Sequence, residues 1–332
     1  MKRKATLRSV LTTVAAVGAL TLAGCSGGGS APETQDGLTK IKVGILPYAN
    51  VAPLYVGMDQ GIFEKHGFEV EPVPFNNGSE EITALIADEI NVAFVGYFTA
   101  AVANSKGLPI QFLANNDQEA AEADDAWAAV TLVAGDSDIK SVKDLEGRTL
   151  AVNALRSQAE VQNTASFEKQ GLDPSTVKLL EVPMPEMGAA LANGSVDAIN
   201  IAEPFASPEL AKGARQIDAP LVSISPAGEN FPNGGWGVTR EFVNSDLAES
   251  LAEAFAEAAD FTQENPDLAR AAIPEFTALT AEQVQNVRLP VWSSTVSRDL
   301  IEYSIDMADS VGLLAKDVTI DDLLAPTAQK FK

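Results

Sequence analysis

The order of apolar and polar segments along the chain predicts strands and helices in regular alternation. From residue 40, short runs rich in β-branched residues alternate with longer runs whose apolar positions recur at helical spacing. In the first part of the chain the predicted strands cover 40–48, 68–75, 91–97 and 109–116, and the predicted helices cover 52–66, 79–89 and 98–106. Strands joined by helices of this length form right-handed crossovers, so we expect a largely parallel sheet.

The alternation resumes after an acidic segment, 117–129. A strand at 129–135 is expected to cross into a second lobe, and a helix at 156–171 is expected to stop at Gly171. From about Asp246 the chain is expected to be almost entirely helical. Two segments, "SEEITALIADEINVAFVGYF" and "MPEMGAALANGSVDAINIAEPF", share a plan of helix, polar turn and strand. This internal symmetry favours two α/β lobes; the alternative is one larger sheet.

Composition bounds the size and the partners of the protein. The chain has 332 residues, of which 46% are hydrophobic and 21% charged, and such a length predicts about two domains. The net charge is −23, so nucleic acid would be repelled and a basic membrane-binding face is not expected.

The first 25 residues carry the features of a lipoprotein signal. Four basic residues precede an apolar run that is too short for a membrane-spanning helix, and the run ends in "LAGC". This ending resembles a bacterial lipobox, which implies that Cys25 is acylated and becomes the first mature residue. Removing 1–24 takes away four positive charges, so the mature charge is −23 − 4 = −27. "SGGGSAPETQDG" then reads as a flexible tether.

The chemistry-bearing residues argue for binding without catalysis. The sequence holds no phosphate-binding loop, no HExxH and no GxSxG, and its single histidine excludes a histidine-rich metal site. His66 follows a helical run and precedes Gly67, a position typical of a helix C-terminus. We therefore expect no catalytic residue, no metal and no cofactor.

Polar side chains recur where predicted strands end, which is where open α/β sheets bind ligands. The candidate ligand-binding residues are Tyr48, Asn50, Asn77, Tyr97, Asn115, Asn153, Arg156, Ser157, Glu203 and Trp236. Arg156 stands near a helix start and could hold an anion together with free N–H groups. Glu203 would instead suit an amino group. Trp236, between glycines, could form an aromatic wall or be a core tryptophan.

Four blocks resemble a known family in the same order. "ANVAPLYVGMDQGIFEKHGFEVEPV", "ITALIADEINVAFVGY", "VKDLEGRTLAVN" and "LANGSVDAINIAEPF" are similar to the ABC-transporter substrate-binding proteins for nitrate, sulfonate, taurine and thiamine-pyrimidine precursors. The resemblance covers roughly 40–265. It implies a type II periplasmic-binding-protein fold, in which two doubly wound lobes close over a ligand cleft, and it implies an ABC permease and an ATPase as partners.

The resulting domain plan has five segments: a signal peptide at 1–24, a tether at 25–39, the first part of lobe 1 at 40–127, lobe 2 at 128–235, and a mainly helical return to lobe 1 at 236–332. The first functional hypothesis is a monomeric binding protein, anchored through Cys25 at the extracytoplasmic face of the cell membrane. Its ligand would be a small organic anion, a sulfonate or carboxylate, held by Arg156. The second is a binding protein for a pyrimidine or similar heteroaromatic that stacks on Trp236 and Tyr48. An enzyme and a structural or sensory lipoprotein are the remaining alternatives.

Overall fold

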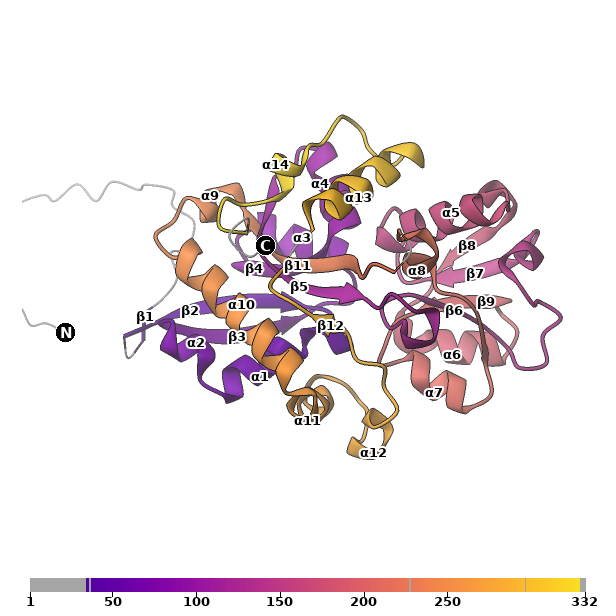
Figure 1. Ribbon diagram of the computed structural model, residues 1–332, viewed down its shortest axis with the longest axis horizontal. Coiled ribbons are helices and arrows are strands. Elements are labelled where there is room, and N and C mark those ends of the chain that lie inside the picture. Colours follow the sequence, from indigo (N-terminus) through magenta and orange to yellow (C-terminus); the bar gives the residue numbers. More distant parts are fainter. Residues whose placement is uncertain (1–33, 36, 227, 296, 329–332) are drawn as a thin grey trace, which may run out of the picture. The chain divides into compact units, whose positions relative to one another are not determined.

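The computed structural model describes residues 34–35, 37–226, 228–295 and 297–328, and its strands form two sheets (Figure 1). The seven-stranded sheet, with its helices, is the first lobe and comprises β1 (Thr34–Gln35), β2 (Leu38–Ile45), β3 (Phe68–Pro74), β4 (Val92–Gly96), β5 (Ile110–Glu119), β11 (Phe231–Thr239) and β12 (Val291–Trp292). The five-stranded sheet belongs to the second lobe and comprises β6 (Val130–Val133), β7 (Thr149–Val152), β8 (Lys178–Glu181), β9 (Ala198–Ile201) and β10 (Arg215–Asp218). The expected pair of α/β lobes, rather than one larger sheet, is confirmed.

Helices lie between the strands and after them along the chain. They are α1 (Ala52–Asp59), α2 (Ile62–Lys65), α3 (Gly78–Ile86), α4 (Tyr97–Ser105), α5 (Gln158–Gln170), α6 (Met184–Ala192), α7 (Ala206–Ala211), α8 (Pro220–Ile224), α9 (Arg240–Val243), α10 (Ala248–Glu264), α11 (Pro266–Phe276), α12 (Ala281–Val284), α13 (Arg298–Ser310) and α14 (Ile320–Leu323). Short 3₁₀ turns occupy Ala49–Val51, Ala123–Asp125, Val142–Leu145 and Pro174–Thr176.

Both sheets are covered on both faces. Along β4, Val92 and Phe94 join the apolar cluster that contains α1 and α10, whereas Ala93 and Val95 join the cluster that contains α3, α4 and α13. Successive side chains of a strand point to opposite faces, so this alternation places helices on each side of the sheet. In the second lobe α6 and α5 divide the faces in the same way. Each lobe is therefore doubly wound.

The two lobes share one strand order. The first sheet contains the order β3-β2-β4-β11-β5, and the second runs β8-β7-β9-β6-β10. The α3–β4 unit and the α6–β9 unit occupy equivalent places, which is the shared plan seen in the sequence. The sheets are less parallel than expected, because β11 and β6 run antiparallel to both of their neighbours. Each of these strands arrives from the other lobe.

Several local details refine the predicted elements. The helix expected at 52–66 is two helices, because Gly61 adopts a φ of +67° between them, and His66 is the C-cap of the second, as expected. β5 continues through Glu119, three residues beyond the strand predicted at 109–116. The C-terminal block includes β12, which pairs with β5. The expected boundary between 235 and 236 falls inside β11, which belongs to the first sheet over its whole length.

No helix among the described residues is long and apolar enough to cross a membrane. The predicted signal peptide at 1–24, Cys25 and most of the predicted tether lie outside the described residues.

Candidate ligand-binding site

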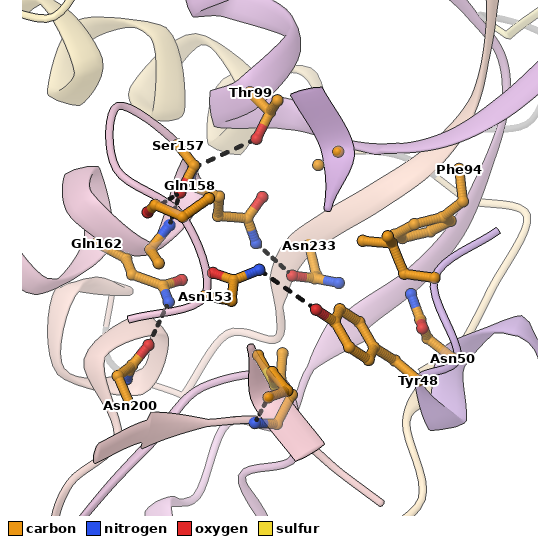
Figure 2. Close-up of a pocket in the computed structure, with 18 of the residues that line it drawn as sticks. Tyr48, Asn50, Phe94, Thr99, Asn153, Ser157, Gln158, Gln162, Asn200 and Asn233 are labelled. Carbon is orange, nitrogen blue, oxygen red and sulfur yellow. Dashed lines mark hydrogen bonds between the residues drawn. The ribbon is translucent and has the colours of Figure 1, made fainter. Parts of the chain in front are cut away.

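A cavity lies where residues of the first lobe face residues of the second (Figure 2). The space that the centre of a water-sized sphere can occupy is about 80 Å³, which is room for several water molecules or for a small solute. Its wall is formed by Leu46, Tyr48, Asn50, Gly78, Ser79, Phe94, Gly96, Thr99, Trp127, Ala128, Asn153, Ala154, Ser157, Gln158, Ala159, Gln162, Met184, Asn200, Ala202 and Asn233.

The wall is built where strands end and helices begin. Tyr48 and Asn50 follow β2, and Gly78 and Ser79 open α3. Gly96 is the N-cap of α4, and Ser157 is the N-cap of α5 in the opposite lobe. In a doubly wound sheet the carboxyl ends of the strands define the ligand-binding edge, so these segments converge on one place.

A buried carboxylate organises the first-lobe side of the wall. The two oxygens of Asp117 accept hydrogen bonds from Asn50 Nδ2 at 3.1 Å, from Asn116 Nδ2 at 2.8 Å and from Asn233 Nδ2 at 2.7 Å. Burial raises the pKa of Asp117 to about 7, although these three hydrogen bonds oppose the shift. Asp117 does not itself line the cavity; it orients two residues that do.

Hydrogen bonds join the two lobes across the cavity. Gln158 Nε2 of the second lobe donates to Asn233 Oδ1 of the first at 2.6 Å, and the backbone N–H of Gln158 donates to Thr99 Oγ1 at 3.3 Å. Asn153 Nδ2 donates to the Tyr48 hydroxyl at 3.2 Å. Figure 2 shows these pairs meeting around the cavity. The cavity is thus closed by contacts between neutral polar groups.

The wall is polar but carries no ionisable acid or base apart from the Tyr48 phenol. Its polar groups are amides and hydroxyls, and Phe94, Trp127 and Met184 provide apolar surface. Burial raises the pKa of Tyr48, so its hydroxyl stays protonated at neutral pH. This arrangement can bind a small solute by hydrogen bonding and apolar contact. It offers no general base beside a nucleophile.

Four of the ten candidate residues lie in the cavity wall: Tyr48, Asn50, Asn153 and Ser157. A fifth, Asn77, is adjacent. Its side chain caps α3 by accepting from the N–H groups of Ser79 and Glu80 at 3.1 Å each. Asn77 therefore shapes the helix start that lines the cavity and does not line the cavity itself.

Tyr97 and Asn115 are buried behind the wall. The Tyr97 hydroxyl donates to Asn115 Oδ1 at 2.9 Å, and Asn115 Nδ2 donates to the carbonyl oxygens of Ser293 and Thr295 at 2.6 and 3.0 Å. These bonds attach the segment after β12 to β5. Both residues therefore position neighbouring segments and do not line the cavity.

The structure places Trp236 in the core of the first lobe and not at the cavity. Its ring stacks on Phe255 with a centroid distance of 4.4 Å, and its Nε1 donates to Asn116 Oδ1 at 3.1 Å. The flanking glycines serve strand packing, because a Cβ on Gly235 would lie 2.4 Å from the Ala114 carbonyl oxygen. The tryptophan that does line the cavity is Trp127.

The two charged candidates also lie off the cavity. Arg156 is exposed with a φ of +52°, and its backbone N–H donates to Glu160 at 2.6 Å. The turn before α5 directs Ser157 to the cavity and leaves the preceding arginine on the surface. Glu203 is buried and accepts from the Ser207 hydroxyl at 2.6 Å. Burial raises the pKa of Glu203, and its bonds to Ser207 and Arg288 oppose the shift.

Sequence reasoning missed Thr99, Gln158, Gln162, Asn200 and Asn233. Asn200 had a visible signal, since it is a polar residue in the middle of the apolar strand β9. Gln158 directly follows a residue that was identified. Asn233 gave no comparable signal, because its place beside the cavity depends on how β11 crosses from the second lobe into the first.

Two doubly wound lobes with a ligand-sized cavity between them define the class of the periplasmic binding proteins. In agreement, the fold is similar to that of the periplasmic aliphatic sulphonate binding protein SsuA from Escherichia coli. The TM-score is 0.70 at 18% identity, with 86% of this chain and 97% of that chain covered. The periplasmic nitrate-binding protein NrtA from Synechocystis PCC 6803 gives a TM-score of 0.69 at 14% identity, with 91% and 86% covered.

The chain belongs to the NMT1-like family, whose model matches residues 34–276. A Bacillus subtilis protein, provisionally named an aliphatic sulfonates-binding protein, is 28% identical over 200 residues, which is 59% of this chain and 57% of that relative. A Brachyspira hyodysenteriae protein, provisionally named an ABC transporter periplasmic binding protein, is 26% identical over 266 residues, which is 75% of this chain and 72% of the relative. These relatives are named as binding proteins and not as enzymes, in agreement with the expectation of binding without catalysis.

Proposed function

We propose that this protein is the solute-binding component of an ABC importer and captures a small polar solute between its lobes. The observation that carries the proposal is a polar cavity walled by both lobes and bridged by the Gln158–Asn233 and Asn153–Tyr48 hydrogen bonds. A solute that contacts both lobes binds the closed arrangement better than an open one, so it shifts the population towards closure. Closure would present the loaded protein to the permease and its ATPase.

Two classes of solute are candidates. The first class is an oxyanion, which was also expected from the sequence. It is supported by relatives and structural neighbours that are named for binding sulfonate or nitrate. A nitrogen heteroaromatic is the second, and Trp127 and Phe94 offer it apolar surface in place of Trp236. Arg156, the residue expected to hold an anion, does not line the cavity. The polarity of the wall is the property that can separate these classes.

The proposed location rests on the sequence. A lipid anchor at Cys25 would hold the protein at the extracytoplasmic face of the cell membrane, and the tether would let a monomer reach its permease. Under this proposal the strong negative charge of the chain serves solubility.

The test is a thermal-shift screen over small sulfonates, carboxylates, nitrate, amines and pyrimidines, followed by calorimetry on the hits. A bound solute stabilises the folded state by mass action. Gln158→Ala is expected to weaken the affinity of any hit by about tenfold or more, because a bridging hydrogen bond at the cavity is lost.

Arg156→Ala is the matched control, two positions away on the exposed side of the same turn. It is expected to leave the affinity unchanged. A large loss of affinity in Arg156→Ala with no loss in Gln158→Ala would contradict the proposed site. Failure of every solute class to stabilise the protein would contradict the proposed function.

A further inference from the structure

The amide side chains of the cavity wall share one polarity. Each of the six donates an N–H to another side chain: Asn50 and Asn233 to Asp117, Asn153 to Tyr48, Gln158 to Asn233, Gln162 to Asn200, and Asn200 to Thr131. One N–H of each of these amides is therefore engaged within the protein.

Asp117 determines this direction when it is ionised. A carboxylate can only accept hydrogen bonds, so Asn233 must turn its nitrogen to Asp117 and its oxygen to Gln158. Gln158 must then turn its own nitrogen to Asn233 and keep its oxygen free. The same argument turns the nitrogen of Asn50 to Asp117. The orientation of three wall amides thus follows from one buried acid.

Three of the oxygen ends are left without donors, whereas Asn233 Oδ1 accepts from Gln158 and Asn200 Oδ1 accepts from Gln162. Asn50 Oδ1, Gln158 Oε1 and Gln162 Oε1 are buried, and within the described part of the chain none of them has a hydrogen-bond partner. A buried carbonyl oxygen without a donor is unfavourable by about as much as a lost hydrogen bond. A solute that brings N–H groups would supply what these three oxygens lack.

An oxyanion finds no cation in the same wall, and two of the helix starts there are capped. The backbone N–H groups that open α3 are bound by Asn77, and those that open α5 are bound by Thr99 and Ser157. No lysine, arginine or histidine lines the cavity. Helix N-termini and cations are the usual anion-binding groups. Here α3 and α5 are capped and the cations are elsewhere, whereas α4, whose N-cap Gly96 lines the wall, has no side-chain cap.

A buried acid next to the cavity points in the same direction. Glu81 is fully buried, and neither of its carboxyl oxygens has a partner among the described residues. Its Oε2 lies 3.9 Å from the position that a Cβ on the cavity residue Gly78 would take. Burial raises the pKa of Glu81 well above its ordinary value and favours the neutral acid, and a positive ligand nearby would favour its ionised form. With Asp117 behind Asn50, both acids therefore favour a positive ligand over a negative one.

We propose that the cavity selects small nitrogen solutes whose N–H groups face Asn50, Gln158 and Gln162, and that it discriminates against oxyanions. Ammonium, amidinium and amino-substituted heterocyclic groups share this chemistry. The inference rests on the proposed function, since it names the solute class of that same cavity. It replaces the sulfonate or carboxylate expected from Arg156.

The first experiment uses pairs of probes with matched shape and opposite polarity at a pH of about 8, above the pKa of Asp117 of about 7. Acetamidinium is compared with acetate, guanidinium with nitrate, and neutral acetamide serves as the reference, all at millimolar concentration in thermal shift and calorimetry. The N–H member of each pair is expected to bind at least about tenfold more tightly than its oxyanion partner, which corresponds to the gain from one or two satisfied buried acceptors.

The second experiment reverses the polarity of the amides with Asp117→Asn. Because the Oδ2 position accepts from both Asn50 and Asn116, the new amide keeps its oxygen there and turns its nitrogen to Asn233. Asn233 and Gln158 must then rotate, and Gln158 presents N–H where it presented an oxygen. Preference is expected to move from the amidinium towards acetate by about tenfold.

Asp218→Asn is the matched control, because Asp218 is a buried acid bonded to Ser166, Gln170 and Ser223 and does not line the cavity. It is expected to leave the selectivity unchanged. Should Asp117→Asn not fold, Asn153→Asp carries the test instead, and it is expected to strengthen amidinium binding by adding a negative charge to the wall.

The outcomes separate the two proposals. Oxyanions that bind as well as or better than their N–H partners would overturn the inference and leave the proposed function standing. Absence of binding by every probe, in the wild type and in Asn153→Asp, would overturn the inference, and failure of every class in the wider thermal-shift screen as well would overturn both.

Discussion

At the residue scale, the polar residues predicted to bind ligand differ in whether a neighbouring side chain holds them in the cavity wall. Asn50 and Asn153 lie in the cavity wall with one amide hydrogen engaged, so each is oriented as well as positioned. Arg156 lies three residues from Asn153 in sequence and faces solvent. Proximity in sequence was therefore a poor guide to which side chain meets the ligand, since a turn before a helix start reverses direction within one residue.

Asp117 is expected to make stability depend on pH. Its pKa is about 7 in the folded protein against an ordinary value of 3.8, so between these values the folded state holds a proton that the unfolded state has lost. The free energy of unfolding should therefore fall as pH rises from about 4 to about 7 and level off above, by up to about 4 kcal/mol from this group. Urea unfolding at a series of pH values measures it.

Asp117→Asn is the reference for that measurement. Glu119, whose pKa burial also raises to about 7, contributes a slope of the same sign in both proteins, so the difference between the two curves isolates Asp117. A wild type whose stability rises across this range relative to the variant would contradict the assignment.

At the element scale, helix starts and glycines position the cavity wall. The caps by Asn77 and Ser157 fix where α3 and α5 begin. On β11, Gly234 and Gly235 allow β4 and β5 to approach, because a Cβ on either glycine would lie under 3.0 Å from a neighbouring atom. Asn233 reaches the cavity from the start of this closely packed segment. Close packing of β11 therefore determines both the position of Asn233 in the cavity wall and part of the stability of the first lobe.

Gly235→Ala is expected to destabilise the protein by about 1–3 kcal/mol, because the added methyl group would lie 2.4 Å from the Ala114 carbonyl oxygen and β11 would have to shift. Gly78→Ala is the matched control for folding, since the nearest atom to its new Cβ would be 3.7 Å away. Chemical unfolding of both variants measures the difference. Equal stability of the two would show that β11 has more room than its contacts indicate.

At the scale of the whole molecule, the chain crosses between the lobes from β5 to β6 and from β10 to β11. Glu119 ends β5 at the first crossing, and its carboxylate accepts the backbone N–H groups of Ala120, Trp127, Ala128 and Ala129 at 2.9–3.3 Å. Arg288 adds a contact near the same place by donating to the Ala126 carbonyl at 3.0 Å and to Gln216 at 2.8 Å. These bonds fix the path of the connecting segment on which Trp127 and Ala128 reach the cavity.

The proposed membrane anchor is also a property of the whole molecule. Metabolic labelling with a fatty acid is expected to mark the wild-type protein and a Ser26→Ala variant, and to leave a Cys25→Ser variant unmarked, because the acyl chains require the thiol of the first mature residue. Stable attachment to the membrane needs more than one acyl chain. Because Cys25→Ser cannot carry these chains, it should also lose membrane association once its signal peptide is removed. An unlabelled wild type would contradict the anchor.

The sequence by itself determined most of the elements, the two-lobe class and the family. Local patterns suffice for these, because apolar periodicity, helix stops such as Gly171 and His66, and the repeated α3–β4 and α6–β9 plan all lie within short segments. It also identified four residues of the cavity wall, since strand ends in this fold converge on one edge. The antiparallel β11 and β6 escaped it, because strand direction depends on the lobe from which the chain arrives.

Only the tertiary structure decided which polar groups meet and what they offer a ligand. Asp117 joins Asn50 across 67 positions and Asn233 across 116, and no local pattern connects them. Those bonds turn Asn50 and Gln158 so that their amide oxygens remain free, and the turn before α5 leaves Arg156 in solvent. Residue type gave a list of polar side chains. Their direction, and with it the choice between an anion and an N–H donor, is set by long-range packing.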